Sequence, residues 1–279
     1  MTHKVAEVPE ARLDPGIDQR PGEAIAESSA PIIVLTYAHT GAELLSQLLS
    51  ASPRLACTSA TGLLPVCHDA ISAWQQAEGR TGRPSALAIK SVRTLATAMI
   101  TVIQACHGAR RWCEIAYSGP EVAETFLQVF PATRFLCLYR SMPGVLSEAV
   151  GVHPWGLGDS PFWAYSSSHP GNNVATIAAY WTVRSQALLD FESGHPGSCI
   201  RVRYEDLADD SGLRAAGIFD ALGLDDGELA RLREPARKGQ YGTHEAALDT
   251  GESQFPVDRI PLALRSRAAE VSARLGYEF

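Results

Sequence analysis

The sequence lacks the features that mark several specialised classes of protein. No uninterrupted apolar run approaches the ~20 residues that cross a bilayer as a helix. The N-terminus also lacks the charged and then apolar pattern of a secretory signal. Positive charge is scarce, since the formal net charge is −7, and this argues against a general nucleic-acid-binding protein. We therefore expect a cytoplasmic protein that binds neither a membrane nor a nucleic acid.

The six cysteines are scattered along the chain and form no Cys-x-x-Cys pair. Several lie inside apolar stretches, where cysteine behaves as a small hydrophobic residue. This pattern predicts reduced thiols rather than disulfides or zinc ligands. No cluster of histidine, cysteine and carboxylate residues has the spacing of metal ligands either, so we expect no metal.

The chain does have ample apolar content, 46% over 279 residues, which is enough for one large core. Residues 1–30 are polar, contain spaced prolines and show no periodicity, so we expect a disordered N-terminal tail. Residues 31–279 are expected to form one domain. The sequence leaves the oligomeric state open.

Runs typical of buried strands alternate with stretches of helical periodicity in this domain. Strands are expected at 32–35, 112–117, 134–140 and 199–207, and helices from Pro120, over about 174–192, 211–222 and 227–236, and in a last segment ending at Gly276. Residues 56–107 are expected to be mostly helical with a break at 79–84, and 151–173 to form a lid or substrate loop. The alternation predicts an α/β fold with a central, mostly parallel sheet flanked by helices.

The most informative stretch is 31–49, PIIVLTYAHTGAELLSQLL. A short apolar strand leads through small residues directly into a leucine-rich helix. Such a turn aims free backbone N–H groups and the positive end of the helix dipole at one point, which favours a phosphate-like anion. No Gly-Lys pair occurs here, so the loop is not of the nucleoside-triphosphatase kind. The alternative is a buried strand–turn–helix unit that binds nothing.

Two further segments follow in a fixed order: RFLCLYRSMPGVLS at 134–147, and IRVRYEDLADD at 200–210 followed by ALGL at 221–224. Together with the opening loop, they resemble the sulfotransferase family that uses 3′-phosphoadenosine 5′-phosphosulfate (PAPS), in particular its bacterial members. The resemblance covers residues 31–279. It implies a P-loop-like sulfotransferase fold, PAPS as co-substrate and no metal.

The resemblance also implies roles for individual residues in donor binding. Arg140 matches the arginine for the donor 3′-phosphate, where a guanidinium fork can bind phosphate with two hydrogen bonds. Ser147 matches its second ligand, with a gap of seven residues where eight is usual. The remaining implied positions are Tyr204 near the adenine, Thr40, Gly41 and Ala42 in the loop, and Arg237, Lys238 and Gly239 over the 3′-phosphate. Arg237 and Lys238 are alternatively a solvated charge pair.

The chain departs from the family pattern at the sulfonate end of the site. His39 stands where a basic residue is expected, and Ala42 and Glu43 stand where two hydroxyl residues are expected. In the segment WCEIAYSGP, Ile115 replaces a lysine that would contact the bridging oxygen of the donor. Lys90 is an alternative candidate for the missing lysine, but its distance in sequence from Arg140 places it on a helix.

Sulfonyl transfer needs positive charge at the sulfonate and a base for the acceptor, as phosphoryl transfer does. His39 as an imidazolium could replace the lost cation. Glu43 or Glu114 could deprotonate the acceptor. The alternatives are an exposed first-turn residue for Glu43, a loop residue for His39, and a structural ion pair with Arg110 or Arg111 for Glu114.

We therefore expect a transferase that moves a sulfonyl group from PAPS to a hydroxyl or amine of a small-molecule acceptor, with secondary metabolites as one option. Aromatic residues in the 151–173 segment (His153, Trp155, Phe162, Trp163 and Tyr165) suggest an apolar or aromatic acceptor. Two alternatives stay open: PAPS-independent acid–base chemistry on the same fold, such as a cyclisation or elimination, and a non-catalytic nucleotide-binding protein.

Overall fold

The computed structural model describes residues 30–108, 111–153, 156–158, 160–209, 211–224 and 257–279. The predicted tail up to residue 29, the predicted helix at 227–236 and the Arg237-Lys238-Gly239 element lie outside the described residues. Within them, the strands form one parallel sheet in the order β2-β3-β1-β4-β5. Their bounds are β1 Ile32–Leu35, β2 Leu55–Ser59, β3 Arg111–Ala116, β4 Arg134–Tyr139 and β5 Cys199–Arg203. The predicted α/β class with a parallel sheet is confirmed.

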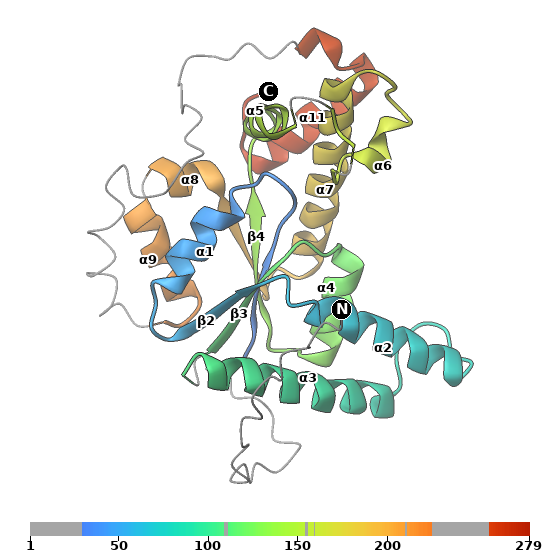
Figure 1. Ribbon diagram of the computed structural model, residues 1–279, viewed down its shortest axis with the longest axis vertical. Helices are drawn as coiled ribbons and strands as arrows, with labels where there is room; N and C mark the ends of the chain where they lie inside the picture. The colour runs from blue at the N-terminus through green and yellow to red at the C-terminus, as the bar shows by residue number, and fades with distance from the viewer. Residues whose placement is uncertain (1–29, 109–110, 154–155, 159, 210, 225–256) are drawn as a thin grey trace, which may run out of the picture.

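Helices cover both faces of the sheet (Figure 1). Their bounds are α1 Ala42–Ser50, α2 Leu63–Ala77, α3 Ala86–Cys106, α4 Pro120–Val129, α5 Met142–Val152, α6 Trp163–Ser166, α7 Asn173–Gly194, α8 Tyr204–Asp209, α9 Ser211–Ala221 and α11 Leu262–Leu275, with a 3₁₀ turn at Val257–Arg259. Figure 1 shows α1, α8 and α9 on one side of the sheet and α2, α3, α4 and α7 on the other.

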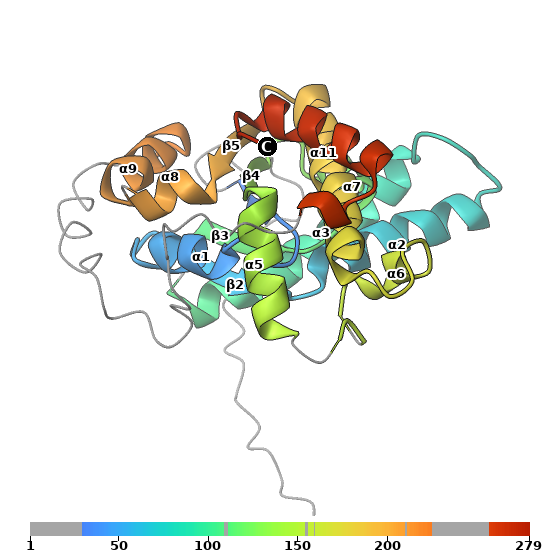
Figure 2. The same ribbon diagram turned by 90° about the horizontal axis from the view of Figure 1, so that it is seen from above.

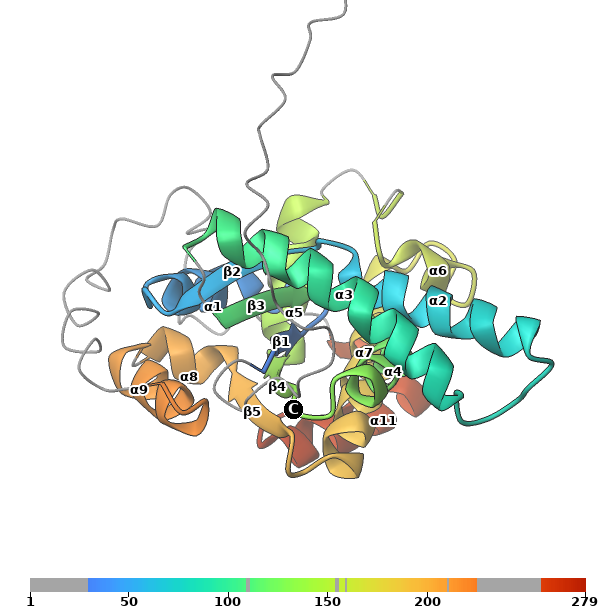
Figure 3. The same cartoon turned by 90° about the horizontal axis from the view of Figure 1, so that it is seen from below.

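The core is divided between these two faces because side chains alternate along each strand. On β1, Ile33 and Leu35 pack with α2, α3, α4 and α7, a group that Figure 3 shows from below. The intervening Ile32 and Val34 pack with α1 and α9. All four residues of β1 are buried, which explains why this strand appears in the sequence as an unbroken apolar run.

The strand order reverses at β1, so the carboxyl end of this strand is the place where a sheet of this kind binds ligands. The chain leaves β1 for the edge strand β2, and later crosses from β3 to β4 on the other side of β1. Loops that leave neighbouring parallel strands in opposite directions open a ligand-binding crevice between them. The loops after β1 and β4 therefore frame the candidate site, and Figure 2 shows α5, which follows β4, lying between α1 and the α6–α7 region.

Two sequence-based predictions need correction. Residues 55–59 form the edge strand β2, although 56–107 were expected to be mostly helical. Only Leu55 and Ala56 of this strand are buried, so its apolar pattern is too short to stand out. Strand β5 ends at Arg203, and Tyr204–Asp209 form α8 instead of continuing the strand. Glu205 and Asp206 lie in the first turn of α8, where the helix dipole favours acidic side chains.

Helix α3 is the one described helix that is long and apolar enough to cross a membrane by length and composition. It contains Lys90 and Arg93. Lys90 lies on a helix, as expected, and its side chain is exposed. A row of residues one turn apart, Ala88, Val92, Ala96 and Ile100, packs into the core. This row accounts for the position of α3 as a helix that covers the sheet.

Candidate functional site

The turn between β1 and α1 is held by hydrogen bonds from its own side chains and from α7. The Thr40 hydroxyl donates to the carbonyl oxygen of Tyr37 at 2.9 Å and also contacts the Thr36 hydroxyl. The backbone N–H of Ala38 donates to the Tyr180 hydroxyl at 2.9 Å. Thr40 is buried, and its hydroxyl is already engaged with the turn. Its contribution to the predicted donor site would therefore come through the backbone.

Gly41 is required by both backbone conformation and space. Its φ of 81° lies in the left-handed region, and a Cβ atom there would lie 2.1 Å from the ring of Tyr204. Tyr204, the first residue of α8, therefore packs directly on the turn. Helix α1 starts at Ala42 without a side-chain cap. The Leu44 N–H donates to the Gly41 carbonyl oxygen at 3.1 Å, which leaves the N–H groups of Ala42 and Glu43 for an anion.

Arg140 follows β4 and is fixed from three sides. Its Nη1 donates to the carbonyl oxygen of His39 at 3.0 Å, and its guanidinium lies 4.2 Å from the centre of the Tyr204 ring. Its own carbonyl oxygen accepts a hydrogen bond from the Trp181 indole at 2.8 Å. The structure thus brings together three residues that the sequence predicted for donor binding, Gly41, Arg140 and Tyr204, with His39 beside them.

Glu148, on α5, bridges the two candidate cations of the site. One carboxylate oxygen lies 3.1 Å from His39 Nδ1, and the other accepts a hydrogen bond from Arg140 Nη1. The contact with His39 and the guanidinium of Arg140 outweigh partial desolvation and lower the pKa of Glu148 to about 2. His39 adds a positive charge to this bridge only when it is protonated.

Aromatic rings from the predicted lid segment cover His39. The His39 ring stacks on Phe162 with 5.5 Å between ring centres, and His153 meets it edge-on at 5.8 Å. Phe162 is buried and packs edge-on against Tyr180 at 4.8 Å. Trp163 beside it is 64% exposed. The segment therefore covers one side of the turn and exposes the aromatic side chain of Trp163 to solvent. Trp155 lies outside the described residues.

The two predicted acid–base carboxylates have different surroundings. Glu43 is exposed in the first turn of α1 and accepts a hydrogen bond from Gln47 at 2.9 Å. Burial raises the pKa of the Tyr117 phenol, and the negative charges of Glu43 and Glu148 raise it further. Both carboxylates therefore act on the space around Tyr117, which follows β3.

Glu114 is buried in β3, and its carboxylate accepts hydrogen bonds from uncharged groups. It accepts hydrogen bonds from the Thr58 hydroxyl at 2.5 Å, the Thr61 N–H at 2.7 Å and the Thr61 hydroxyl at 2.9 Å. Arg111 instead donates to backbone carbonyls, and Arg110 lies outside the described residues. These contacts tie β3 to β2, which contains Thr58, and to Thr61 just after it.

For the other predicted positions that the structure describes, no side-chain contact with the turn between β1 and α1 is seen. Ser147 is exposed on α5, next to Glu148 in the sequence. Ala42 is buried at the start of α1. Ile115, at the position of the missing lysine, packs in the core on the α1 face.

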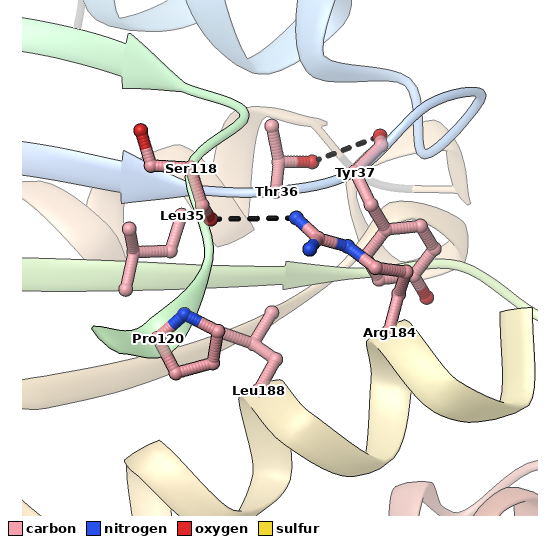
Figure 4. Close-up of a pocket in the computed structure, with 7 residues that line it drawn as sticks. All are labelled: Leu35, Thr36, Tyr37, Ser118, Pro120, Arg184 and Leu188. Atoms are coloured by element: carbon pink, nitrogen blue, oxygen red, sulfur yellow. Dashed lines mark hydrogen bonds between the residues drawn. The ribbon is translucent and has the colours of Figure 1, made fainter. Parts of the chain in front are cut away.

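A small cavity lies beside the turn, between β1, the segment after β3 and α7 (Figure 4). Its volume is about 10 Å³, close to what one water molecule needs. The lining residues are Leu35, Thr36, Tyr37, Ser118, Pro120, Arg184 and Leu188. Arg184 reaches across from α7 and donates to the carbonyl oxygen of Ser118 at 3.4 Å. The cavity is too small for a substrate, and its residues support the turn.

Sequence reasoning missed Glu148 and Tyr180. The unusual gap of seven residues between Arg140 and Ser147 was a signal, because the eighth residue is Glu148. Nothing in the sequence marks Tyr180, which lies in a long helix most of whose N-terminal half is buried. Among the residues that the structure describes, no three His, Cys, Asp or Glu side chains gather into a group that could hold a metal ion.

Three comparisons relate the chain to known proteins. The sequence profile of the sulfotransferase family matches residues 31–228. A comparison with curated protein sequences gives no significant match. Several solved structures share the fold, at identities that are too low to transfer an activity.

The first of these structures is a sulfotransferase domain from the curacin biosynthetic pathway, with 17% identity, a TM-score of 0.58, and coverage of 89% of this chain and 98% of that domain. The sulfotransferase domain of the Synechococcus PCC 7002 olefin synthase has 17% identity, a TM-score of 0.55, and coverage of 94% and 100%. Sulfotransferase STF9 from Mycobacterium avium has 14% identity, a TM-score of 0.54, and coverage of 91% and 79%. The chain belongs to the sulfotransferase family, and its fold is that of bacterial sulfotransferases.

Proposed function

We propose that the protein transfers a sulfonyl group from PAPS to a hydroxyl or amine of a small-molecule acceptor. The observation that supports this proposal is the contact between Arg140 and His39 beside the N-terminus of α1, which brings a guanidinium, an imidazole and helix N–H groups close together. A phosphosulfate donor carries negative charge at both ends, and this arrangement supplies a partner for each.

The donor end of the site rests on Arg140, which would bind the 3′-phosphate of PAPS. Tyr204 would lie beside the adenine, and the backbone around Thr40, Gly41 and Ala42 would hold the phosphosulfate. Arg140 is only 13% exposed and already fixed by the His39 carbonyl and the Tyr204 ring, so little conformational entropy is lost when it binds an anion. Ser147, Arg237, Lys238 and Gly239 remain proposed ligands of the 3′-phosphate.

At the sulfonate end, His39 would stabilise the transferred group. The acceptor oxygen or nitrogen attacks sulfur, the bond from sulfur to the bridging oxygen of the donor breaks, and the acceptor proton passes to a base. Protonated His39 would offset the charge that develops on the oxygens. Of the two predicted bases, Glu43 is the more accessible, because Glu114 is buried and bonded to three donors.

The acceptor would meet the aromatic side chains near His39. His153 and Phe162 contact the His39 ring, and the exposed Trp163 extends this surface. An apolar or aromatic acceptor fits such a surface. The similar domains from the curacin pathway and the olefin synthase support a secondary-metabolite acceptor. We place the reaction in the cytoplasm. Membership of the sulfotransferase family does not favour PAPS-independent chemistry or a non-catalytic role.

The direct test is a transfer assay with PAPS that carries radiolabelled sulfur and a panel of phenols, alcohols and amines. We expect label to move to at least one acceptor, with adenosine 3′,5′-bisphosphate formed in equal amount. His39→Ala should lower turnover more than donor affinity. The control variant is Glu124→Gln, on α4, which should behave as the wild type does. The proposal fails if the donor binds but no acceptor of any of the three chemical classes becomes labelled.

A further inference from the structure

The two candidate cations of the site are already engaged by a carboxylate of the chain itself. Glu148 contacts His39 Nδ1 with one oxygen and Arg140 Nη1 with the other. A nucleotide phosphate that binds Arg140 must therefore either displace Glu148 or lie beside it. Two negative groups that share one guanidinium repel each other, and an arginine fork cannot give its best geometry to both.

Arg140 does not depend on Glu148 for its position. Its guanidinium also donates to the His39 carbonyl at 3.0 Å and stacks on Tyr204 at 4.2 Å. The side chains of His39 and Arg140 are 12% and 13% exposed, whereas that of Glu148 is 41% exposed. The cations are thus fixed in the wall of the site, and the carboxylate lies over them on the side that faces solvent.

A carboxylate at this place favours a different ligand group from a phosphate. It accepts hydrogen bonds, which a hydroxyl can donate and an ionised phosphate cannot. Together, Arg140 and Glu148 offer a donor and an acceptor whose charges cancel. Such a pair matches a neutral ribose hydroxyl better than a phosphate dianion.

We propose that Glu148 is a specificity-determining residue that weakens binding of a nucleotide with a 3′-phosphate relative to one with a 3′-hydroxyl. This inference rests on the proposed function, in which Arg140 faces the 3′ position of the donor ribose. Glu148 acts through charge at that position, and it sets how strongly the protein distinguishes donors such as PAPS from nucleotides that lack the 3′-phosphate.

The experiment measures dissociation constants by isothermal titration for two probes, adenosine 3′,5′-bisphosphate and adenosine 5′-phosphate. The proteins are the wild type, Glu148→Gln, Glu148→Ala and the control Glu124→Gln. Glu124 forms a similar carboxylate–histidine pair, with His195 at 3.1 Å, on another part of the surface. Thermal unfolding of each variant checks that it is folded.

We expect both substitutions of Glu148 to increase the preference for the bisphosphate at least ~10-fold, about the effect of removing one nearby like charge, and Glu124→Gln to leave it unchanged. An unchanged preference in both Glu148 variants overturns the inference. A reduced preference in both also overturns it and makes Glu148 a positioning residue for Arg140. If neither nucleotide binds any of the proteins, the donor site of the proposed function fails as well, whereas bisphosphate binding to the wild type preserves it.

Discussion

Glu114 and Glu148 are both carboxylates with hydrogen bonds at the same sheet, but their surroundings differ in two respects. Glu114 is 2% exposed and bonds only to neutral donors, two hydroxyls and one N–H. Glu148 is 41% exposed and bonds to the side chains of His39 and Arg140. A buried carboxylate that bonds with both oxygens to a neighbouring strand and loop holds these segments together. A half-exposed carboxylate beside an arginine and a histidine is free to exchange with a ligand, so burial and partner type distinguish the two carboxylates.

The largest effect that we expect from substituting either carboxylate is on the free energy of unfolding, and it comes from Glu114. Glu114→Ala removes a buried side chain and, with it, three hydrogen bonds, one from the half-buried Thr58 hydroxyl and two from Thr61. We predict a loss of about 3 kcal/mol in the free energy of unfolding, measured by urea denaturation. The matched control Glu43→Ala changes an exposed carboxylate and should stay within about 0.5 kcal/mol of the wild type. Equal stability of the two variants would remove the structural role of Glu114.

A second prediction concerns the close contact between the turn and Tyr204. Gly41→Ala forces a left-handed backbone on alanine and drives its Cβ into the Tyr204 ring. Gly62→Ala, before α2, has the same backbone strain with no atom within 4 Å of the added carbon. We expect about 1 kcal/mol of destabilisation for Gly62→Ala and at least about 1 kcal/mol more for Gly41→Ala.

Gly41→Ala should also weaken nucleotide binding, because the Tyr204 ring must shift and its stacking with Arg140 is then disturbed. Titration of both variants checks this. If Gly41→Ala binds nucleotide as well as Gly62→Ala does, Tyr204 does not form part of the donor site.

The smallest effect is the pH dependence of the Glu148 bridge. The folded protein lowers the pKa of Glu148 from the ordinary 4.5 to about 2, so its stabilising contribution is complete above about pH 4.5 and is lost as the pH falls toward 2. Because the side chain is well exposed, solvent screening reduces this contribution to about 1 kcal/mol. Urea denaturation should show the wild type more stable than Glu148→Gln by this amount near pH 6. The difference should disappear in strong acid, and a constant difference across the range would rule out titration of Glu148 as its source.

The sequence was sufficient to predict the elements whose residues are buried along their whole length. Strand β1 and the part of β4 after Arg134 appear as apolar runs because helices cover both of their faces. The edge strand β2 could not be found in the same way, since only its first two residues are buried. The α8 segment was misassigned because its residues follow β5 without a break, although Glu205 and Asp206 suit the first turn of a helix.

In the candidate site, sequence reasoning found the residues that lie directly after strands. His39, Arg140 and Tyr204 follow β1, β4 and β5, and the carboxyl ends of parallel strands meet at one edge of the sheet. Glu148 could not be found this way, because its contact with His39 depends on the direction in which α5 leaves the sheet. The role of Glu114 likewise depends on threonines that another strand brings beside it.

The most direct test of the central claim, that Arg140 binds the donor, is isothermal titration of the protein with adenosine 3′,5′-bisphosphate. The wild type should show saturable binding, and Arg140→Ala should weaken it at least ~10-fold, since a charge-assisted hydrogen-bonded pair is lost. Arg80→Ala, which changes an exposed arginine in the loop after α2, should bind as the wild type does. Equal affinity of folded Arg140→Ala and the wild type, or no binding to the wild type at all, would contradict the account.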